Sequence, residues 1–69
     1  MMSMNHKLIA SGTNGTVQVF LDRWDYEDYV VSIHYGNGTV RESFENMTRA
    51  CQKFFESCRE NGIEPKKAF

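Results

Sequence analysis

The fold can be inferred from residues 29–63, which read YVVSIHYGNGTVRESFENMTRACQKFFESCRENGI. The first half alternates apolar and polar residues on both sides of a glycine-asparagine-glycine turn, a pattern typical of a β-hairpin. The second half repeats apolar residues every three or four positions and stops at Gly62, which is typical of an amphipathic helix. The sequence therefore predicts one hairpin followed directly by one helix.

The hairpin is predicted to consist of strands over residues 29–35 and 39–44 joined by Asn37-Gly38, a pair that tolerates the positive φ angles of a type I′ turn. The cross-strand pairs expected from this turn are Tyr35 with Val40, Ile33 with Glu42, and Val31 with Phe44. One face then carries Tyr29, Val31, Ile33, Tyr35, Val40 and Phe44, and the other carries Val30, Ser32, His34, Arg41 and Ser43. Because Glu42 is a charged residue on the apolar face, the strand over 39–44 is expected to be an edge strand.

The helix is predicted to run from Met47 to Glu60, with Asn46 as its N-cap and Gly62 at the C′ position of its glycine stop. Pro65 prevents any continuation of the helix. The residues expected on its single apolar stripe are Met47, Ala50, Cys51, Phe54, Phe55 and Cys58.

Two more strands are predicted before the hairpin, over residues 7–11 and 16–24, with turn-forming residues between them. In the longer strand Val17, Val19 and Leu21 point to one face, and Gln18, Phe20, Asp22 and Trp24 point to the other. The predicted fold is α+β, a four-stranded antiparallel β-meander in β-β-β-β-α order with one C-terminal helix packed on one face. We expect a single domain over residues 1–69, with its ordered core over residues 7–63.

Composition and charge limit the classes of function. The 69 residues carry a net charge of −1, whereas general polyanion binders are usually clearly basic. No apolar run approaches the ~18 residues needed to cross a bilayer, so no membrane interaction is expected. Cys51 and Cys58 would lie about 10.5 Å apart along one helix, too far for a disulfide between them. Two reduced thiols favour a cytoplasmic location.

One helix can cover only one face of the sheet, so the opposite face is predicted to be solvated or to bind a partner. Its expected members are Gln18, Phe20, Trp24, Val30, Ser32, His34, Arg41 and Ser43. Residues 22–29 add an acidic aromatic loop whose composition suits a protein interface. The predicted function is a small interaction module that binds a protein partner or itself, as a homodimer. The predicted partner-binding residues are Phe20, Trp24, Tyr26, Val30, His34 and Arg41.

The tight turn at residues 36–39, a strand that ends in Ser43-Phe44 and a helix with Phe54-Phe55 midway resemble small DNA-binding modules of sheet and helix. These modules are the amino-terminal domains of phage integrases and the AP2-type domains, and the resemblance covers about half of the chain. It implies that the sheet face away from the helix lies in the major groove. The matching positions are Ser32, His34, Thr39, Arg41 and Ser43. This chain departs from the pattern because it lacks a basic cluster, so nucleic-acid binding is the alternative function.

Catalytic and metal-binding patterns are weak in this sequence. Cys51 and Cys58 fall on the apolar stripe of the helix, where a thiol normally serves packing. His6 and His34 lie far apart in the sequence, with no paired serine or carboxylate evident near either. The four acidic residues within positions 22–28 lack the spacing of a calcium loop. We therefore expect no enzymatic activity, no cofactor and no metal site.

Overall fold

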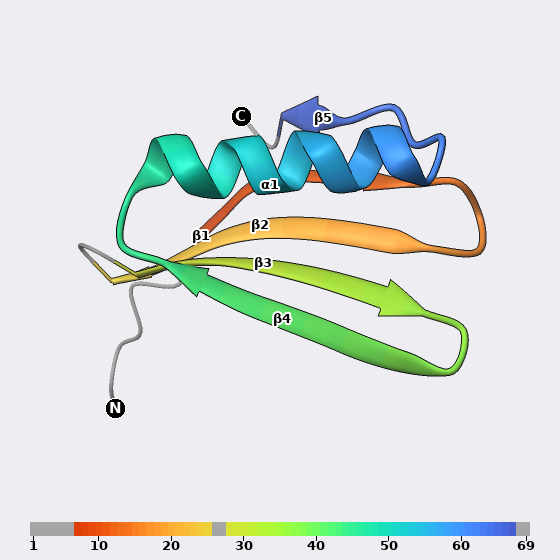
Figure 1. The fold of residues 1–69 in the computed structure, drawn as a ribbon, viewed down its shortest axis with the longest axis horizontal. Helices are drawn as coiled ribbons and strands as arrows, with labels where there is room; N and C mark the ends of the chain where they lie inside the picture. Colours follow the sequence, from red (N-terminus) through yellow and green to blue (C-terminus); the bar gives the residue numbers. More distant parts are fainter. Residues whose placement is uncertain (1–6, 26–27, 68–69) are drawn as a thin grey trace.

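The computed structural model describes residues 7–25 and 28–67, which form one sheet with one helix on one side (Figure 1). The elements in chain order are β1 (Lys7–Thr13), β2 (Gln18–Asp25), β3 (Asp28–Tyr35), β4 (Gly38–Phe44), α1 (Met47–Glu60) and β5 (Lys66–Lys67). Neighbouring strands are antiparallel, and their order across the sheet is β4-β3-β2-β1-β5. The α+β fold, the four-stranded meander and the single helix after it are therefore confirmed.

The short strand β5 is an addition that the sequence does not predict. After the helix the chain turns back along β1, where Lys66 pairs with Ser11 and Lys67 pairs with Ala10. This pairing gives β1 a neighbour on its outer side, so that edge of the sheet is partly closed. Two residues are too few for any alternation of apolar and polar side chains, and the sequence therefore gives no signal for β5.

The β3–β4 hairpin has a different register from the predicted one. Gly36 and Asn37 form the turn, and Tyr35 pairs with Gly38 instead of Val40. The other observed pairs are His34 with Thr39, Ile33 with Val40, Ser32 with Arg41, Val31 with Glu42, Val30 with Ser43 and Tyr29 with Phe44. The predicted register is thus wrong by two residues. Because side chains alternate with a period of two, this shift leaves every side chain on its predicted face, and β4 lies at the edge of the sheet as predicted.

The hairpin turn also differs in backbone conformation from the predicted one. Among the described residues only Gly15 and Gly62 have a positive φ, so the hairpin turn is not the type I′ turn predicted at Asn37-Gly38. The observed register places Ile33 opposite Val40 and Val31 opposite Glu42, whereas the predicted one would place Ile33 opposite Glu42 and Val31 opposite Phe44. Each register thus places one apolar residue of β3 opposite the glutamate, and the structure gives no side-chain reason for the shift.

The helix begins and ends at the residues predicted from its caps. The side chain of Asn46 accepts a hydrogen bond from the backbone N–H of Thr48 at 2.7 Å, which satisfies a helix donor that has no intrahelical partner. At the other end Gly62 has a φ of +65°, and the N–H of Ile63 donates to the carbonyl of Cys58 at 2.8 Å. This hydrogen bond from C″ to C3 is the Schellman arrangement expected from the glycine stop.

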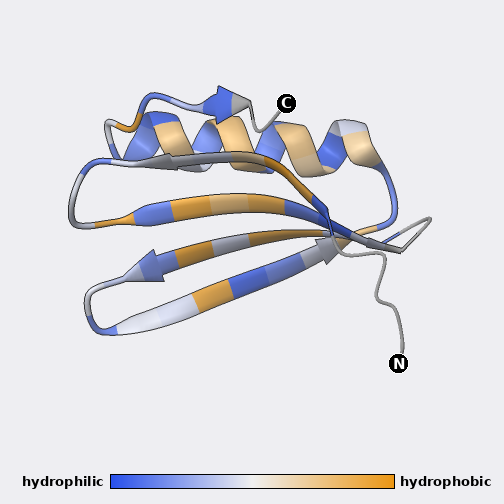
Figure 2. Cartoon of the chain, turned by 180° about the vertical axis from the view of Figure 1, so that it is seen from behind, coloured by the Kyte–Doolittle hydropathy of each residue, from blue (hydrophilic) through white to orange (hydrophobic). Residues whose placement is uncertain are grey.

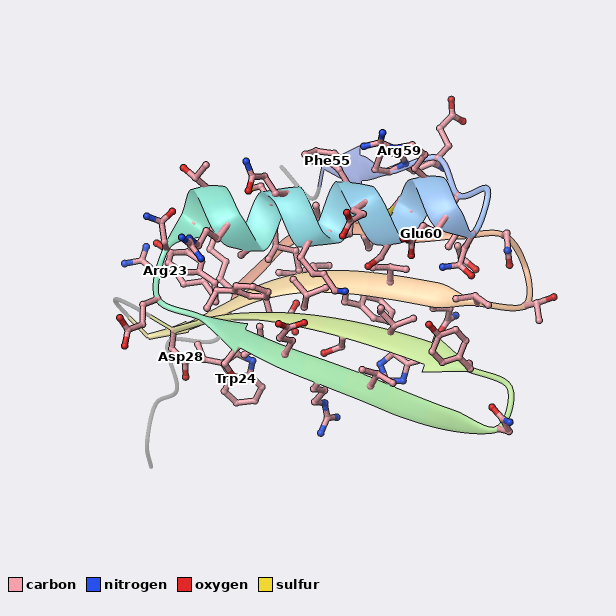
Figure 3. All side chains as sticks on the ribbon, in the orientation of Figure 1. Arg23, Trp24, Asp28, Phe55, Arg59 and Glu60 are labelled. Atoms are coloured by element: carbon pink, nitrogen blue, oxygen red, sulfur yellow. The ribbon has the colours of Figure 1, made fainter. Side chains whose placement is uncertain are left out.

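The apolar stripe of the helix is narrower than predicted. Ala50, Phe54 and Cys58 are buried, together with Ser57. Met47 and Phe55 are exposed, so their predicted place in the stripe is wrong. Successive residues on a helix are turned by about 100°, and Phe55 falls outside the buried arc that Ala50, Phe54, Ser57 and Cys58 define. The ring of Phe55 points away from the sheet (Figure 3) and packs edge-on against Phe54, with ring centroids 5.3 Å apart.

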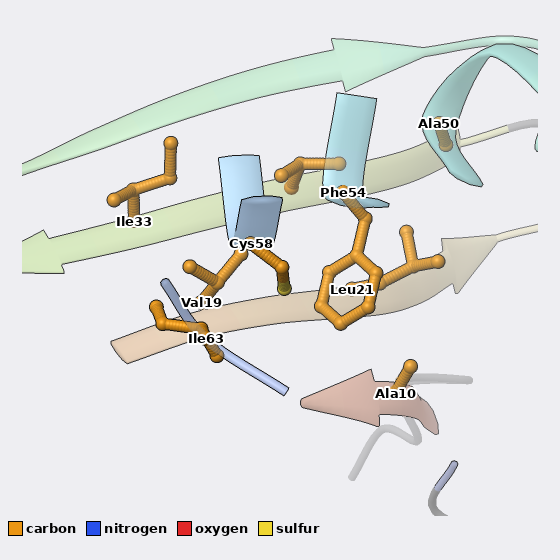
Figure 4. Close-up of a cluster of buried hydrophobic side chains, with 9 residues drawn as sticks. Ala10, Val19, Leu21, Ile33, Ala50, Phe54, Cys58 and Ile63 are labelled. Atoms are coloured by element: carbon orange, nitrogen blue, oxygen red, sulfur yellow. The ribbon is translucent and has the colours of Figure 1, made fainter. Parts of the chain in front are cut away.

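The hydrophobic core lies between α1 and the helix-facing side of the sheet (Figure 4). Its buried residues are Ala10, Val19, Leu21, Val31, Ile33, Ala50, Phe54, Cys58 and Ile63. Hydropathy along the ribbon follows this arrangement, with hydrophobic segments in β2 and β3 and mostly hydrophilic ones in β4 (Figure 2). The helix packs mainly over β2 and β3, so the core is centred there and β4 contributes little to it.

Gly12 lets the chain segment after the helix approach β1 closely. A Cβ atom at this position would lie 2.6 Å from the Cγ2 of Ile63 and 3.3 Å from the carbonyl oxygen of Glu64. Real Cβ atoms do not approach other heavy atoms to 2.6 Å, so a side chain at position 12 would require Ile63 or the backbone beside it to shift. The glycine therefore positions the segment that leads to β5.

Truncating Phe54 should lower the free energy of unfolding much more than truncating its exposed neighbour. Phe54→Ala is expected to cost about 3–5 kcal/mol, because a fully buried ring leaves a cavity. Phe55→Ala is the matched control and is expected to cost less than about 1 kcal/mol. Urea unfolding followed by circular dichroism measures both values. Equal losses for the two variants would contradict the packing described above.

A double-mutant cycle tests the contact between Gly12 and Ile63. Gly12→Ala is expected to lower the free energy of unfolding by about 1–3 kcal/mol through overpacking. In an Ile63→Ala background the clashing Cγ2 is gone, so the same substitution should cost clearly less. If the losses in the free energy of unfolding simply add, residues 12 and 63 are not in contact.

Candidate binding face of the sheet

The sheet face that points away from α1 is here called the open face, and no described helix or strand covers it (Figure 1). Strand pairing and alternation give its members among the described residues. They are Leu8, Ser11, Thr13, Gln18, Phe20, Asp22, Trp24, Asp28, Val30, Ser32, His34, Thr39, Arg41, Ser43 and Lys66. The open face therefore draws side chains from all five strands.

Cross-strand pairing arranges the open face in rows that run across the strands. The central row is Arg41, Ser32, Phe20, Ser11 and Lys66, in spatial order from β4 to β5. The row nearer the β3–β4 turn is Thr39, His34, Gln18 and Thr13, and the row on the other side is Ser43, Val30, Asp22 and Leu8. Strands lie about 4.8 Å apart, so Arg41 and Lys66 stand roughly 19 Å apart with Phe20 midway between them.

Four apolar side chains, here called the apolar end, gather around Asp22 on the open face. They are Leu8, Phe20, Trp24 and Val30. Leu8 is 39% exposed and Trp24 is 38% exposed, while the other two are half-buried. Contiguous apolar side chains at this degree of exposure are costly in water, and on soluble proteins they typically mark an interaction site.

An irregularity in β2 determines how Trp24 is presented. The pairing of β2 with β3 shifts between Arg23 and Asp25, so Trp24 occupies a β-bulge. Bulges bend a strand and re-aim its side chains. Trp24 lies on the open side of the sheet and Arg23 lies on the helix side (Figure 3). The bulge thus places the largest side chain of the open face at the margin of the sheet.

Neighbouring side chains hold His34 in place. Its ring meets the ring of Phe20 edge-on, with centroids 5.3 Å apart and an interplanar angle of 79°. The Nδ1 atom of His34 lies 3.1 Å from the hydroxyl oxygen of Thr39, a hydrogen bond whose direction depends on the tautomer. These contacts fix the orientation of Phe20 and His34 before any partner arrives, which lowers the entropic cost of binding.

A hollow of about 430 Å³ adjoins the central row on the β1 side of the open face. Its lining residues are Ser11, Gly12, Thr13, Gln18, Phe20, Glu64 and Lys66. Hydroxyl, amide, ammonium and carboxylate groups surround one aromatic ring, so the hollow could accept a polar side chain as well as an apolar one.

The structure brings together most of the predicted site residues. Phe20, Trp24, Val30, His34 and Arg41 all lie on the open face. The remaining predicted partner-binding residue, Tyr26, lies outside the described residues. The described part of the acidic aromatic segment over residues 22–29 is not a loop, because residues 22–25 belong to β2 and residues 28–29 belong to β3.

The alternative nucleic-acid set also lies on the open face. Its members are Ser32, His34, Thr39, Arg41 and Ser43. Ser32 is only 6% exposed, because it stands within the central row between larger side chains. Its hydroxyl would reach a bound strand only after those neighbours moved.

Sequence reasoning missed several residues of the open face, among them Leu8 and Lys66. Leu8 reaches it because the pairing of β1 with β2 shifts between Leu8 and Ala10, and a bulge of this kind leaves no mark in the hydrophobic pattern. Lys66 reaches it through β5. Neither position could be found from alternation within a single strand.

Groups with potential chemical reactivity lie apart from the open face. Burial raises the pKa of the Cys58 thiol above its ordinary value, so the thiol stays protonated and unreactive at neutral pH. Cys51 is a half-buried, unbridged thiol on the same helix. In residues 7–25 and 28–67 no group of three or more His, Cys, Asp or Glu side chains is placed to hold a metal ion. No helix in the same part of the chain has the length and apolarity to cross a membrane.

Comparisons with models of known families, with curated proteins and with solved structures find no match for this chain. The resemblance to integrase amino-terminal and AP2-type modules therefore stays a prediction.

Proposed function

We propose that the protein is a non-enzymatic interaction module of the cytoplasm that binds a protein partner through the open face. The observation that carries this proposal is the apolar end, where Leu8 and Trp24 are more than a third exposed beside the half-buried Phe20 and Val30. The helix lies on the other side of the sheet and cannot cover these residues. The proposed location follows from two unbridged thiols, which are typical of a reducing compartment.

The composition of the open face suits a protein surface. Interfaces combine aromatic anchors with a polar rim, and tryptophan is strongly enriched among the residues that contribute most binding energy. Here Trp24 is the anchor, Asp22 is a charge within the apolar end, and Arg41 and Lys66 form parts of the rim. Charges of both signs on one face favour a partner with a defined pattern of charge over any uniformly charged polymer.

Trp24→Ser should remove binding to a protein partner while leaving the fold intact. Affinity capture from the source cells with wild type, Trp24→Ser and Phe55→Ser as baits identifies candidates, and titration of the purified partner measures affinity. We expect Trp24→Ser to weaken binding at least about 30-fold, as for an interface residue worth 2 kcal/mol or more. Phe55→Ser, an exposed aromatic on the opposite side of the molecule, should change affinity little. Equal affinities of wild type and Trp24→Ser would refute the proposal.

A second copy of the chain is the first alternative partner of the open face. Light scattering of the wild type across a concentration series, repeated with Trp24→Ser and Phe20→Ser, distinguishes it. A wild-type dimer that both substitutions disrupt would identify a second copy as the partner of the open face. A dimer unaffected by either would exclude the open face as its interface.

Single-stranded nucleic acid is the second candidate partner, and the central row is the observation that favours it. Phe20 stands midway between Arg41 and Lys66, and one aromatic ring flanked by cations is the arrangement on which an unpaired base stacks while its phosphates are neutralised. The net charge of −1 and the position of Asp22 in the adjacent row weigh against this candidate.

Salt dependence separates this candidate from protein binding. If two cations contact phosphates, the logarithm of the affinity for a single-stranded oligonucleotide should fall with the logarithm of salt at a slope of about −1.4. Arg41→Gln and Lys66→Gln should each bring that slope closer to zero by about 0.7. Absence of binding to single- or double-stranded oligonucleotides near ~50 mM salt would remove the nucleic-acid class.

A further inference from the structure

The two edges of the sheet differ in how they are protected. At one edge, the two-residue strand β5 follows Pro65 and pairs with β1. At the other edge, β4 is seven residues long, pairs with β3 without any register shift and has no described neighbour on its outer side (Figure 1). It contains no proline, no lysine and no bulge, and the edge protection it does carry is limited to one pair of opposite charges, Arg41 and Glu42. A regular edge strand with a free outer side is a template for another strand.

The hairpin geometry determines which backbone groups of β4 point outward. A two-residue turn is closed by a hydrogen-bonded pair, here Tyr35 with Gly38, and antiparallel pairs then alternate between bonded and non-bonded. The backbone groups of Val40 and Glu42 consequently point toward β3. Those of Thr39, Arg41 and Ser43 point away from the sheet, where an added strand would meet them.

Val40 is the most exposed large hydrophobic residue of the described chain, at 52%. It lies on the helix-facing side of β4, but α1 packs mainly over β2 and β3 and leaves it uncovered. Next to it, Glu42 makes a long ion pair with Lys53 of the helix, 3.9 Å between the Oε1 and Nζ atoms. A strand laid along β4 would cover Val40 without disturbing this ion pair.

We propose that β4 is an interface at which a second copy of this chain pairs with it. The two β4 strands run antiparallel about a two-fold axis perpendicular to the sheet, with Val40 opposite Val40 of the partner copy. Both helices then lie on one side of a continuous ten-stranded sheet, and both open faces lie on the other. The assembly is independent of the proposed function, because it uses the edge of the sheet and leaves the open face accessible.

A second copy of the chain meets both the charge and the symmetry requirements of pairing along β4. Because the interface is two-fold, the strand must pair with itself about one of its own residues. Pairing about Arg41 or Glu42 places like charges directly opposite each other, which is destabilising. Pairing about Val40 places Thr39 opposite Arg41 and Gly38 opposite Glu42, with no like charges opposite. The same register covers the most exposed apolar residue with an identical apolar partner.

Sedimentation equilibrium over micromolar to millimolar concentrations tests the assembly. Wild type should show a reversible monomer–dimer equilibrium. Val40→Lys should be monomeric, because it places two ammonium groups opposite each other at the axis. Arg41→Pro should also be monomeric, because it removes only an outward N–H and leaves the β3–β4 pairing intact. Phe55→Lys, an equivalent substitution on the far side of the helix, should dimerise like wild type. A wild type that is monomeric throughout, or a Val40→Lys variant that still dimerises, would overturn the proposal.

Disulfide trapping tests the register. Val40→Cys should form a covalent dimer on mild oxidation, because residues opposite each other in a non-bonded pair are close enough to bridge. In the same register the two Glu42 positions are about 14 Å apart along the strand, so Glu42→Cys should stay monomeric on a non-reducing gel. Wild type controls for Cys51 and Cys58. Efficient trapping through position 42 and not through position 40 would contradict the pairing about Val40.

Trp24→Ser separates this assembly from the proposed function. It should retain the wild-type monomer–dimer equilibrium while losing the protein partner of the open face. Val40→Lys should do the reverse and bind that partner as a monomer. A Trp24→Ser variant that no longer dimerises would place the self-association on the open face and refute the pairing through β4.

Discussion

The sheet has two faces and is wider than one helix, so the single helix α1 can cover only part of one face. The helix α1 lies over β2 and β3, and its residue Phe54 is fully buried against them. This placement covers the helix-facing side of these two strands and leaves two other surfaces uncovered. One is the open face, and the other is the outer part of β4 with Val40. A domain of 69 residues can build only one core layer. The surfaces that remain for binding therefore follow from where the helix is placed.

The parts of the fold that local chemistry determines could be predicted from the sequence. The helix has a side-chain cap at Asn46 and a glycine stop at Gly62, and both act over a few residues. The division of the hairpin into two faces was also predictable, because the observed register differs from the predicted one by two residues, and a shift of two keeps every side chain on its face. The exact register, with the turn at Gly36-Asn37 instead of Asn37-Gly38, did not follow from the preferences of the turn residues.

The parts that depend on distant contacts could not be predicted. Strand β5 exists because the chain after the helix returns to β1, and Gly12 permits the close approach of Ile63 that guides it there. The bulge that places Leu8 on the open face is likewise set by how neighbouring strands fit, and no residue type marks it. As a result, the middle of the open face and its β4 side could be predicted through Phe20, Val30 and Arg41, whereas Leu8 and Lys66 on the β1–β5 side could not.

In the described part of the chain, exposed apolar residues occur on three surfaces that differ in how many such residues adjoin one another. Met47 and Phe55 on the helix stand as single side chains amid polar neighbours, and Tyr35 and Val40 flank the hairpin turn. On the open face, by contrast, Leu8 and Trp24 adjoin half-buried apolar side chains from two further positions and surround a carboxylate. Isolated exposed residues are ordinary on soluble proteins, whereas contiguous exposed apolar side chains are typical of an interaction site. The side that the helix leaves open is thus also the side whose composition is least explained by folding alone.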